Sequence, residues 1–341
     1  MGRAAVLAGV GACVPARVVP NHELATSWDV EPAWIQTRTG IEQRHIVAPG
    51  EATSDLAVEA GRRALVCAGT TEAAAVVVAT NTPDRLSPAV APDIAARLGL
   101  GAVAAFDVGA VCSGFVYALA TGAGLIAAGT ASSVLVIGAD TFSTVLDPQD
   151  LKTRAVFGDG AGAVVLRAGH HDEAGALAGM RLGSDGGRST LIEIPGGGSR
   201  QRSTSQPVKV EDIYLRMEGR AVFGQAVLRL SQSVRHSATD VGWTIDEVDR
   251  WVLHQGNARI LAAVAQHLRV PLERFITNIA RVGNTVAASV PLALADGLAA
   301  GDLRAGHRVV LAGFGGGLTW GSVALVWPDL PNGASAGSTD T

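Results

Sequence analysis

Cys112 is the residue of this sequence best placed to act as a nucleophile. It lies in DVGAVCSGF (residues 107–115), among small residues and at the start of an apolar, helix-compatible run. The positive end of a helix favours the thiolate, which is the reactive form of cysteine. Small neighbours also leave backbone amides open to a substrate. We therefore predict a reactive Cys112 with a lowered pKa, and we interpret Cys13 and Cys67 as small core residues.

Two polar residues in similar settings could assist a thiol. His254 ends the strand-like WVLHQGN, and Asn284 follows a glycine in RVGNTVAASVP, each ahead of helix-compatible sequence. Catalytic groups in α/β folds gather at the carboxyl ends of strands, although His254 could be a structural histidine and Asn284 only a helix cap. The glycine-rich stretch GFGGGLTWGS (residues 313–322) follows a further strand, and its free amides could stabilise an oxyanion. Together these residues indicate nucleophilic attack on a carbonyl group.

Spacing argues against several other kinds of site. The three cysteines are scattered and form no C-x-x-C pair, so neither a zinc site nor a disulfide scaffold is indicated. The glycine-rich stretches lack the spacing of a phosphate loop, and those of FGDGAGAVVL precede a strand instead of opening a helix. A papain-like protease also uses cysteine, histidine and asparagine, but its C-G-[SA]-C-[WY] signature is missing. We therefore expect no metal.

The elements that must position these residues are short buried strands alternating with Ala-rich helices. Nearly continuous apolar runs at residues 73–80, 132–140 and 161–168 are typical of strands covered on both faces. The run 108–139 contains no charged residue and exceeds the ~20 residues that a bilayer requires. Because it is rich in small residues and is divided at 129–133, we interpret it as a buried helix and strand of an α/β protein, not as a membrane span.

The second half of the chain repeats this scheme. Residues 248–257 and 307–317 are again apolar strands that end in small or polar residues. We therefore predict two related halves, residues 1–172 and 173–327, followed by a disordered tail at 328–341.

Composition limits the partners and the compartment. The formal charge is -4 with 17% charged residues, which provides no basic stripe for nucleic acid. An odd number of widely spaced cysteines and the absence of a signal-peptide pattern favour a reducing cytoplasm. We expect a cytoplasmic protein that binds neither nucleic acid nor a membrane.

Six stretches, in order along the chain, resemble the β-ketoacyl-acyl carrier protein synthase III family. They are TRTGIEQRHI, AFDVGAVCSGF, FGDGAGAVVL, HQGNARI, GNTVAASVP and FGGGLTWGS, and the resemblance covers about residues 4–327. It implies a thiolase fold, in which two duplicated α/β halves form five layers, and a homodimer. It also implies that the uncharged run holds the central helix behind the nucleophile.

The resemblance also implies an acyltransferase reaction. By position, Cys112 accepts an acyl group from acyl-CoA, while His254 and Asn284 bind a malonyl thioester, that of malonyl-acyl carrier protein. The amides of Cys112 and Gly316 match the oxyanion hole. Loading of Cys112 followed by decarboxylative Claisen condensation would give a β-ketoacyl product and prime fatty acid or polyketide synthesis. Acyl-CoA is a substrate in this scheme, and no cofactor is expected.

The same resemblance implies a path for CoA. The matching positions are Trp34, Arg38, Arg154, Phe223, Gly256 and Asn257. Leu151 stands where the family often has an arginine near the nucleotide, but Lys152 and Arg154 are close enough to substitute for it.

The positions that match the carrier-protein docking site and the acyl pocket depart more from the family pattern. Arg259 matches a docking residue, whereas Gln266 and His267 stand where the family commonly has lysines, so the docking patch looks weaker. Ser87 stands where the family can place a bulky aromatic that closes the acyl pocket across the dimer. We therefore expect starter groups beyond acetyl, longer or branched.

Two other functions stay open at this point. A family relative could transfer an acyl group to an oxygen or nitrogen acceptor without decarboxylation, in natural-product biosynthesis. A scaffold that only binds acyl carriers is a non-enzymatic alternative. Asn284 favours condensation because it serves the malonyl step, and the intact set of Cys112, His254 and Asn284 disfavours a scaffold.

Overall fold

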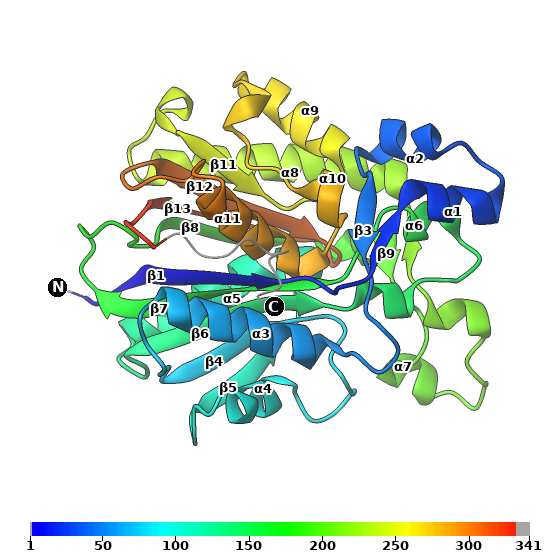
Figure 1. Cartoon of the computed structure of the whole chain (residues 1–341), viewed down its shortest axis with the longest axis horizontal. Coiled ribbons are helices and arrows are strands. Elements are labelled where there is room, and N and C mark those ends of the chain that lie inside the picture. Colours follow the sequence, from blue (N-terminus) through cyan, green and yellow to red (C-terminus); the bar gives the residue numbers. More distant parts are fainter. Residues whose placement is uncertain (1, 332–341) are drawn as a thin grey trace.

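Two mixed β-sheets lie face to face, with helices between them and on both outer faces (Figure 1). The computed structural model describes residues 2–331. The first sheet consists, in spatial order, of β1 (Ala4–Cys13), β7 (Gly160–Gly169), β6 (Ser133–Asp140), β4 (Ala75–Ala79) and β5 (Ala104–Val108). The second sheet consists of β11 (Arg250–Leu253), β12 (Arg308–Gly315), β13 (Thr319–Val326) and β8 (Ala178–Ser184). All five strands predicted from apolar runs are therefore present.

The two sheets share one pairing pattern. Strand β6 runs parallel to β4, while β7 is antiparallel to both β6 and β1. Likewise β12 runs parallel to β11, while β13 is antiparallel to both β12 and β8. Apart from β5, the two halves of the chain thus build two separate sheets with the same pattern of parallel and antiparallel strand pairs. The predicted division between residues 172 and 173 falls in the connection from β7 to β8.

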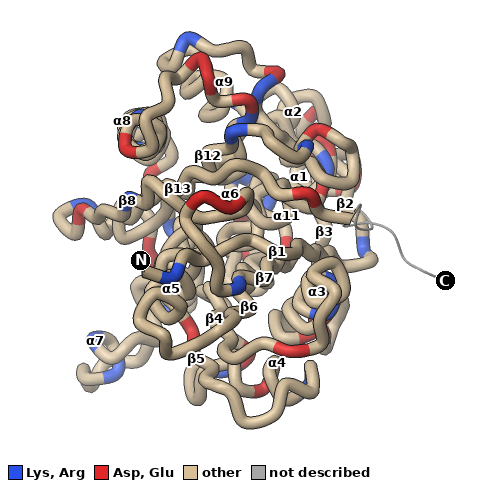
Figure 2. The backbone as a smooth tube through the Cα atoms, turned by 90° about the vertical axis from the view of Figure 1, so that its left-hand side faces the viewer, with Lys and Arg blue, Asp and Glu red and all other residues tan. Residues whose placement is uncertain are grey.

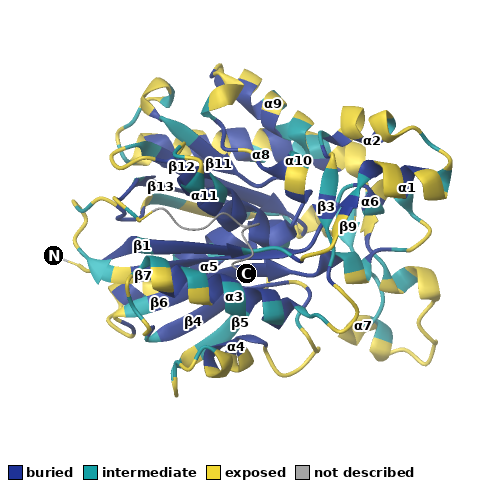
Figure 3. Cartoon of the chain, in the orientation of Figure 1, coloured by how far each residue is buried: buried dark blue, intermediate teal, exposed yellow. Residues whose placement is uncertain are grey.

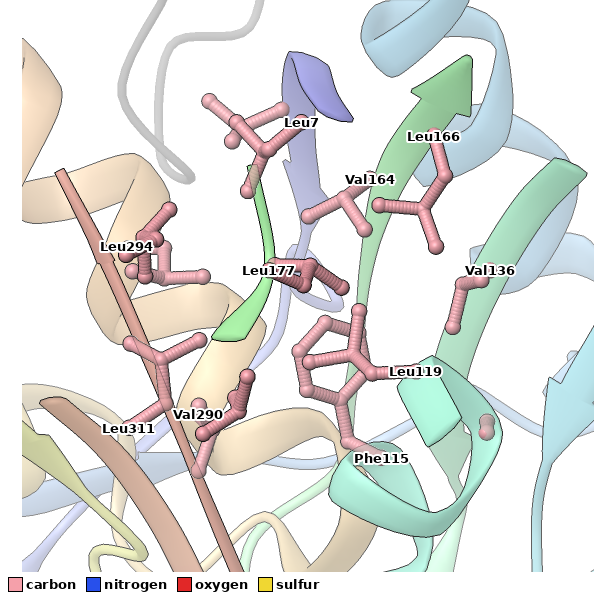
Figure 4. Close-up of a cluster of buried hydrophobic side chains, with 14 of the residues drawn as sticks. Leu7, Phe115, Leu119, Val136, Val164, Leu166, Leu177, Val290, Leu294 and Leu311 are labelled. Atoms are coloured by element: carbon pink, nitrogen blue, oxygen red, sulfur yellow. The ribbon is translucent and has the colours of Figure 1, made fainter. Parts of the chain in front are cut away.

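The middle layer consists of α5 (Gly114–Ala127) and α11 (Ser289–Ala299). Phe115 and Leu119 of α5 and Val290 and Leu294 of α11 pack among the facing side chains of the two sheets (Figure 4). Seven of the 14 residues of α5 are buried and only Gly124 and Ala127 are exposed, which fits a helix without charged residues. The prediction of a buried helix in the uncharged run is confirmed. Within residues 2–331, no helix is long and apolar enough to cross a membrane.

The outer layers are amphipathic helices. Helices α3 (Thr53–Cys67) and α4 (Ala91–Arg97) cover the first sheet, and α8 (Gly219–Asp240) and α9 (Ala258–Leu268) cover the second. Figure 3 shows buried strands and middle helices, with exposed residues on the outward faces of the outer helices. Charges of both signs are mixed over these outer elements (Figure 2). The predicted five-layer thiolase fold is confirmed.

Short elements surround one end of the sheets, on the right of Figure 1. Those from the first half are β2 (Val18–Pro20), α1 (Asn21–Trp28), α2 (Pro32–Thr39), β3 (Gln43–His45), η1 (Val111–Ser113), η2 (Phe142–Val145) and α6 (Leu151–Arg154). Those from the second half are η3 (Gly186–Leu191), β9 (Ile192–Glu193), α7 (Ser199–Arg202), η4 (Val210–Ile213), β10 (Arg216–Met217), α10 (Ile279–Val282) and η7 (Val286–Ala288). The short turn η5 (Ile245–Glu247) precedes β11 in the sequence, and η6 (Leu272–Arg274) follows α9.

The predicted tail falls mostly outside the described residues, since 332–341 are not among them. Its first part is packed, because Pro328 is buried and Leu330 contacts the core between the two sheets.

Candidate active site

Cys112 lies in a tight turn between β5 and α5. The residue before it, Val111, has a φ of 45°, a left-handed conformation that a β-branched side chain rarely adopts. The turn is held in place by the Ser113 hydroxyl, which lies 2.9 Å from the carbonyl oxygen of Ala110 and 2.8 Å from Oγ1 of Thr319. These bonds join the turn to β13 and fix the cysteine at the amino end of α5.

The acidity of Cys112 differs from the sequence prediction. Burial, and after it the carboxylate of Asp140, raise the pKa of the Cys112 thiol. The predicted lowering by the helix end is wrong in direction because a helix dipole contributes at most ~2 kcal/mol, which the desolvation of an enclosed thiol outweighs. The resting site therefore holds a neutral thiol.

His254 stands at the carboxyl end of β11, as predicted. Burial lowers its pKa to about 4, so the imidazole is neutral near pH 7. Its Nδ1 lies 2.7 Å from Oγ of Ser289. A Cβ at position 256 would lie 3.1 Å from Nε2 of His254. Because Gly256 has no side chain, the space beside Nε2 stays open.

Asn284 is oriented by its own backbone segment. Its Oδ1 accepts a hydrogen bond of 3.0 Å from the amide of Val286. Its main chain is joined to the loop 156–158, since its amide donates to Val156 O and its carbonyl accepts from Gly158 N. Within residues 2–331, Nδ2 has no hydrogen-bond partner, so both of its hydrogens are available to a ligand.

Cys112, His254 and Asn284 line a single cavity of about 140 Å³. Most of its other lining residues are apolar: Val111, Phe142, Val156, Phe157, Ile192, Met217, Val222, Phe223, Ala226, Leu230, Ile260 and Phe314. The remaining ones are Gly219, Gly256, Asn257 and Gly315. The structure thus brings a thiol, a neutral imidazole and a free amide together in a largely apolar space, where electrostatic interactions are strong.

A second hollow shares Gly219, Phe223 and Asn257 with this cavity and lies toward the surface. Its lining comprises Trp34, Arg38, Thr39, Lys152, Ala155, Gly219, Arg220, Phe223, Asn257 and Arg259, with no Asp or Glu among them. The Arg38 guanidinium lies 4.5 Å from the centroid of the Trp34 ring, and the Arg38 carbonyl accepts a bond of 3.1 Å from Nδ2 of Asn257. The inner cavity therefore opens through an entrance that carries four cations.

Three residues of the predicted sites, Arg154, Gly316 and Ser87, line neither the inner cavity nor the entrance. Arg154 lies over the ring of Trp28, at 5.4 Å, and it does not line the entrance, whereas Lys152 does. Gly315, and not its neighbour Gly316, is among the residues that line the inner cavity. Ser87 is exposed and lines neither cavity of this single chain. Within residues 2–331, no group of three His, Cys, Asp or Glu side chains could hold a metal ion.

The sequence predictions missed three polar residues around the site. Ser289 contacts His254, Asp140 lies near Cys112 in a fully buried position, and Arg220 lines the entrance. Asp140 ends an apolar strand, as His254 does, and this position is a signal that could have indicated it. Neither Ser289 nor Arg220 has a comparable signal in the sequence.

Fold and site together define a cysteine-dependent condensing enzyme of the thiolase fold. Two family models match the chain: 3-oxoacyl-[acyl-carrier-protein] synthase III over residues 106–186, and the C-terminal region of the same synthase over residues 238–327. The chain belongs to the 3-oxoacyl-[acyl-carrier-protein] synthase III family, also called β-ketoacyl-[acyl-carrier-protein] synthase III.

Individual relatives agree over nearly the full length. The chain is 54% identical to β-ketoacyl-[acyl-carrier-protein] synthase III 3 of Streptomyces coelicolor, over 96% of this chain and 98% of the relative. It is likewise 54% identical to the synthase III of Pseudomonas aeruginosa PAO1, over 97% and 98%. The crystal structure of a P. aeruginosa PAO1 synthase III matches with a TM-score of 0.91 and 52% identity, covering 96% of this chain and 100% of that one. A priming β-ketosynthase of the R1128 polyketide pathway matches with a TM-score of 0.88 and 33% identity, covering 97% and 98%. The predicted family and enzyme class are confirmed.

Proposed function

We propose that this enzyme loads an acyl group from acyl-CoA onto Cys112 and condenses it with the malonyl unit of malonyl-acyl carrier protein, priming fatty acid synthesis. One observation carries the proposal: a thiol, a neutral imidazole and an amide with two free hydrogens line the same apolar cavity. Fatty acid synthesis is preferred to polyketide synthesis because the relatives at 54% identity are named as synthases III, and the polyketide-priming relative is only 33% identical.

Loading begins with attack of the Cys112 sulfur on the thioester carbonyl. The C–S bond to CoA breaks, and the proton of the neutral Cys112 thiol leaves with the CoA sulfur. The amides of Cys112 and Gly316 are proposed to stabilise the oxyanion. The acyl-enzyme persists because a cysteine sulfur is both a good nucleophile and a good leaving group.

Condensation uses the two neutral donors. The C–C bond to the malonyl carboxylate breaks, CO2 leaves, and the electron pair forms an enolate whose oxygen accepts hydrogen bonds from His254 and Asn284. The enolate carbon attacks the acyl carbonyl on Cys112, and the C–S bond breaks to release the β-ketoacyl product. The electron pair stays on the Cys112 sulfur as a thiolate, which takes up a proton from water to restore the neutral thiol. These steps require no metal and no redox cofactor. Transfer to an oxygen or nitrogen acceptor is not favoured, because it forms no enolate oxygen for His254 and Asn284 to stabilise.

The cationic entrance supports the choice of thioester carriers. Arg38, Lys152, Arg220 and Arg259 are proposed to attract the phosphates of CoA and of a phosphopantetheine arm, with Trp34 packing on the nucleotide. Arg259 is the proposed contact for the carrier protein.

A homodimer and a cytoplasmic location complete the proposal. Among the described residues 2–331, strand β5 pairs only with β4, and it is partly exposed, so a second copy could extend the sheet there. The three free cysteines, of which Cys13 and Cys67 are half-buried, fit a reducing compartment.

Intact-mass analysis after incubation with single acyl-CoAs, followed by addition of malonyl-acyl carrier protein, tests the function. We expect one acyl adduct that maps to Cys112, release of CO2, and a β-ketoacyl product on the carrier. A Cys112→Ala variant should acquire no adduct, whereas Cys67→Ala should behave as the parent does. An adduct on Cys13 or Cys67, or acyl transfer without CO2, would contradict the proposal. A series of acyl-CoAs tests the expectation from Ser87 that starters extend beyond acetyl.

A further inference from the structure

Among residues 2–331, Ser289 is the one residue whose side chain forms a hydrogen bond with the ring of His254, at Nδ1. It is the first residue of α11 and is fully buried. Its Oγ lies 2.7 Å from Nδ1 of His254 and also accepts a bond of 3.3 Å from the amide of Gln255. The opposite edge of the ring, at Nε2, faces Gly256 and the cavity.

The hydrogen count at Ser289 selects one tautomer of His254. A hydroxyl has one hydrogen and two acceptor lone pairs. If the hydroxyl accepts from Gln255 and donates to Nδ1, the hydroxyl and Nδ1 are both satisfied, and the imidazole proton resides on Nε2, which faces the cavity. If Nδ1 carried the proton, the buried hydroxyl would accept twice, and within residues 2–331 no other hydrogen bond of the Ser289 hydroxyl is found to take its hydrogen. Leaving a buried donor unpaired is costly.

We propose that Ser289 is a positioning residue that holds His254 as the Nε2–H tautomer, with the proton directed into the cavity. The inference rests on the proposed function, because only a donor at Nε2 can stabilise the enolate oxygen of the malonyl unit. One segment then orients both donors: Val286 fixes Oδ1 of Asn284, and Ser289, three residues later, fixes Nδ1 of His254.

The tautomer can be read directly from the nitrogen shifts of 15N-histidine-labelled full-length enzyme, with His254→Gln assigning the signal. We expect a protonated Nε2 and an unprotonated Nδ1 in the parent. Ser289→Ala should move the signal toward the Nδ1–H form or a mixture, and Ser289→Thr, which retains the hydroxyl, should restore the parent pattern. Ser237→Ala is the matched control, because Ser237 is also fully buried with one bond of 2.7 Å, to Gly179 O.

Kinetics separate positioning from general loss of structure. In Ser289→Ala we expect malonyl decarboxylation to fall about tenfold to a hundredfold, while the rate of Cys112 acylation stays within about twofold. An Nδ1–H signal in the parent, an unchanged tautomer in Ser289→Ala, or an equal loss of acylation and decarboxylation would each overturn the inference. If the parent shows the Nε2–H signal but releases no CO2 from malonyl thioester, the proposed function fails while the assigned tautomer stands.

Discussion

Asp140 and Gly315 occupy corresponding places at the ends of β6 and β12, and the carboxylate that Asp140 carries and Gly315 lacks accounts for one difference between the two halves. The carboxylate of Asp140 accepts a hydrogen bond of 3.0 Å from the amide of Ala287. Ala287 lies in η7, directly before α11. A Cβ on Gly315 would lie 2.7 Å from the amide nitrogen of Cys112. Cys112 lies in η1, directly before α5. One amide is therefore covered by an anion of the protein itself, while the other is left open.

Further details support this correspondence. Gly138 packs closely on the carbonyl of Ala287, and Gly313 packs on the backbone around Cys112. The residues Val111 and Val286, which precede the two amides, have φ angles of 45° and 53°. In the second half of the chain, the Ala287 amide donates to a carboxylate oxygen, as the corresponding amide of Cys112 is proposed to donate to an oxyanion.

Gly315→Ala tests whether the open amide is used. The added methyl group would lie 2.7 Å from the Cys112 amide nitrogen and 3.0 Å from its Cβ, so it must displace the turn or cover the amide. We expect acylation of Cys112 by acyl-CoA to slow by about 10² to 10³, which is the usual effect of losing one oxyanion donor. Gly124→Ala in α5, where an added Cβ meets nothing within 4 Å, is the control and should acylate normally. Unimpaired acylation of the Gly315 variant, measured by intact mass, would show that the amide is not needed.

The low pKa of His254 predicts a specific dependence of stability on pH. Its pKa is about 4 in the folded enzyme against an ordinary value of 6.5, so the unfolded chain takes up a proton first as the pH falls. The stabilisation present above pH 6.5 is therefore lost as the pH falls toward 4. Between pH 7 and pH 5 we expect the parent to lose about 2 kcal/mol more unfolding free energy than His254→Gln.

Denaturant unfolding of both proteins at each pH measures this difference. Asp140, whose burial raises its pKa to about 6, titrates in the same window but is present in both proteins, so the comparison isolates His254. Parallel stability curves would mean that the imidazole is not held neutral by the fold.

Arg38→Met tests the cationic entrance. The variant removes a charge from the hollow and the stacking on Trp34 at 4.5 Å. We expect the KM for acyl-CoA to rise about tenfold, which corresponds to ~1.4 kcal/mol, with kcat little changed. An acyl thioester of N-acetylcysteamine, which lacks the nucleotide and its phosphates, should react equally well with parent and variant.

A matched control distinguishes the entrance from arginine loss in general. Arg229 also stacks on a tryptophan, Trp320, at 4.4 Å, but lines neither cavity. Arg229→Met should leave both KM values unchanged. If Arg38→Met weakens the short thioester as much as acyl-CoA, its role lies in the inner cavity or the fold, not in nucleotide binding.

The elements were predictable because each depends on local patterning. The apolar runs at β4, β6, β7, β11 and β12 and the uncharged α5 follow from residues that are neighbours in the sequence. Placement of Cys112, His254 and Asn284 together needed the resemblance as well, since each alone had an ordinary structural explanation.

The finer parts of the site were not predictable because they depend on contacts between distant residues. Ser289 meets His254 across 35 residues, and Asp140 meets Ala287 across 147. The acidity of Cys112 depends on total burial and on a carboxylate 28 positions away in the sequence, which a local helix argument does not include.

Asp140→Asn tests the electrostatic link to the nucleophile. The Asp140 carboxylate raises the pKa of Cys112, and it is charged only above its own pKa of about 6. Removing this charge should lower the pKa of Cys112 and so increase its thiolate fraction. We expect faster alkylation of Cys112 by iodoacetamide at pH 8, with the ratio of variant to parent rates falling toward one below pH 6. Peptide mapping after alkylation identifies the modified cysteine.

Asp159→Asn is the matched control for that experiment. Asp159 is equally buried and accepts bonds from Val47 N, Ser143 N and Ser143 Oγ, but it does not contribute to the pKa of Cys112. The Asp159→Asn variant should therefore be less stable than the parent without a change in the alkylation ratio. Circular dichroism and thermal unfolding measure the structure and stability of both variants. Equal acceleration in the two variants would indicate loosened structure, and an unchanged rate in Asp140→Asn would show that burial alone sets the acidity of the nucleophile.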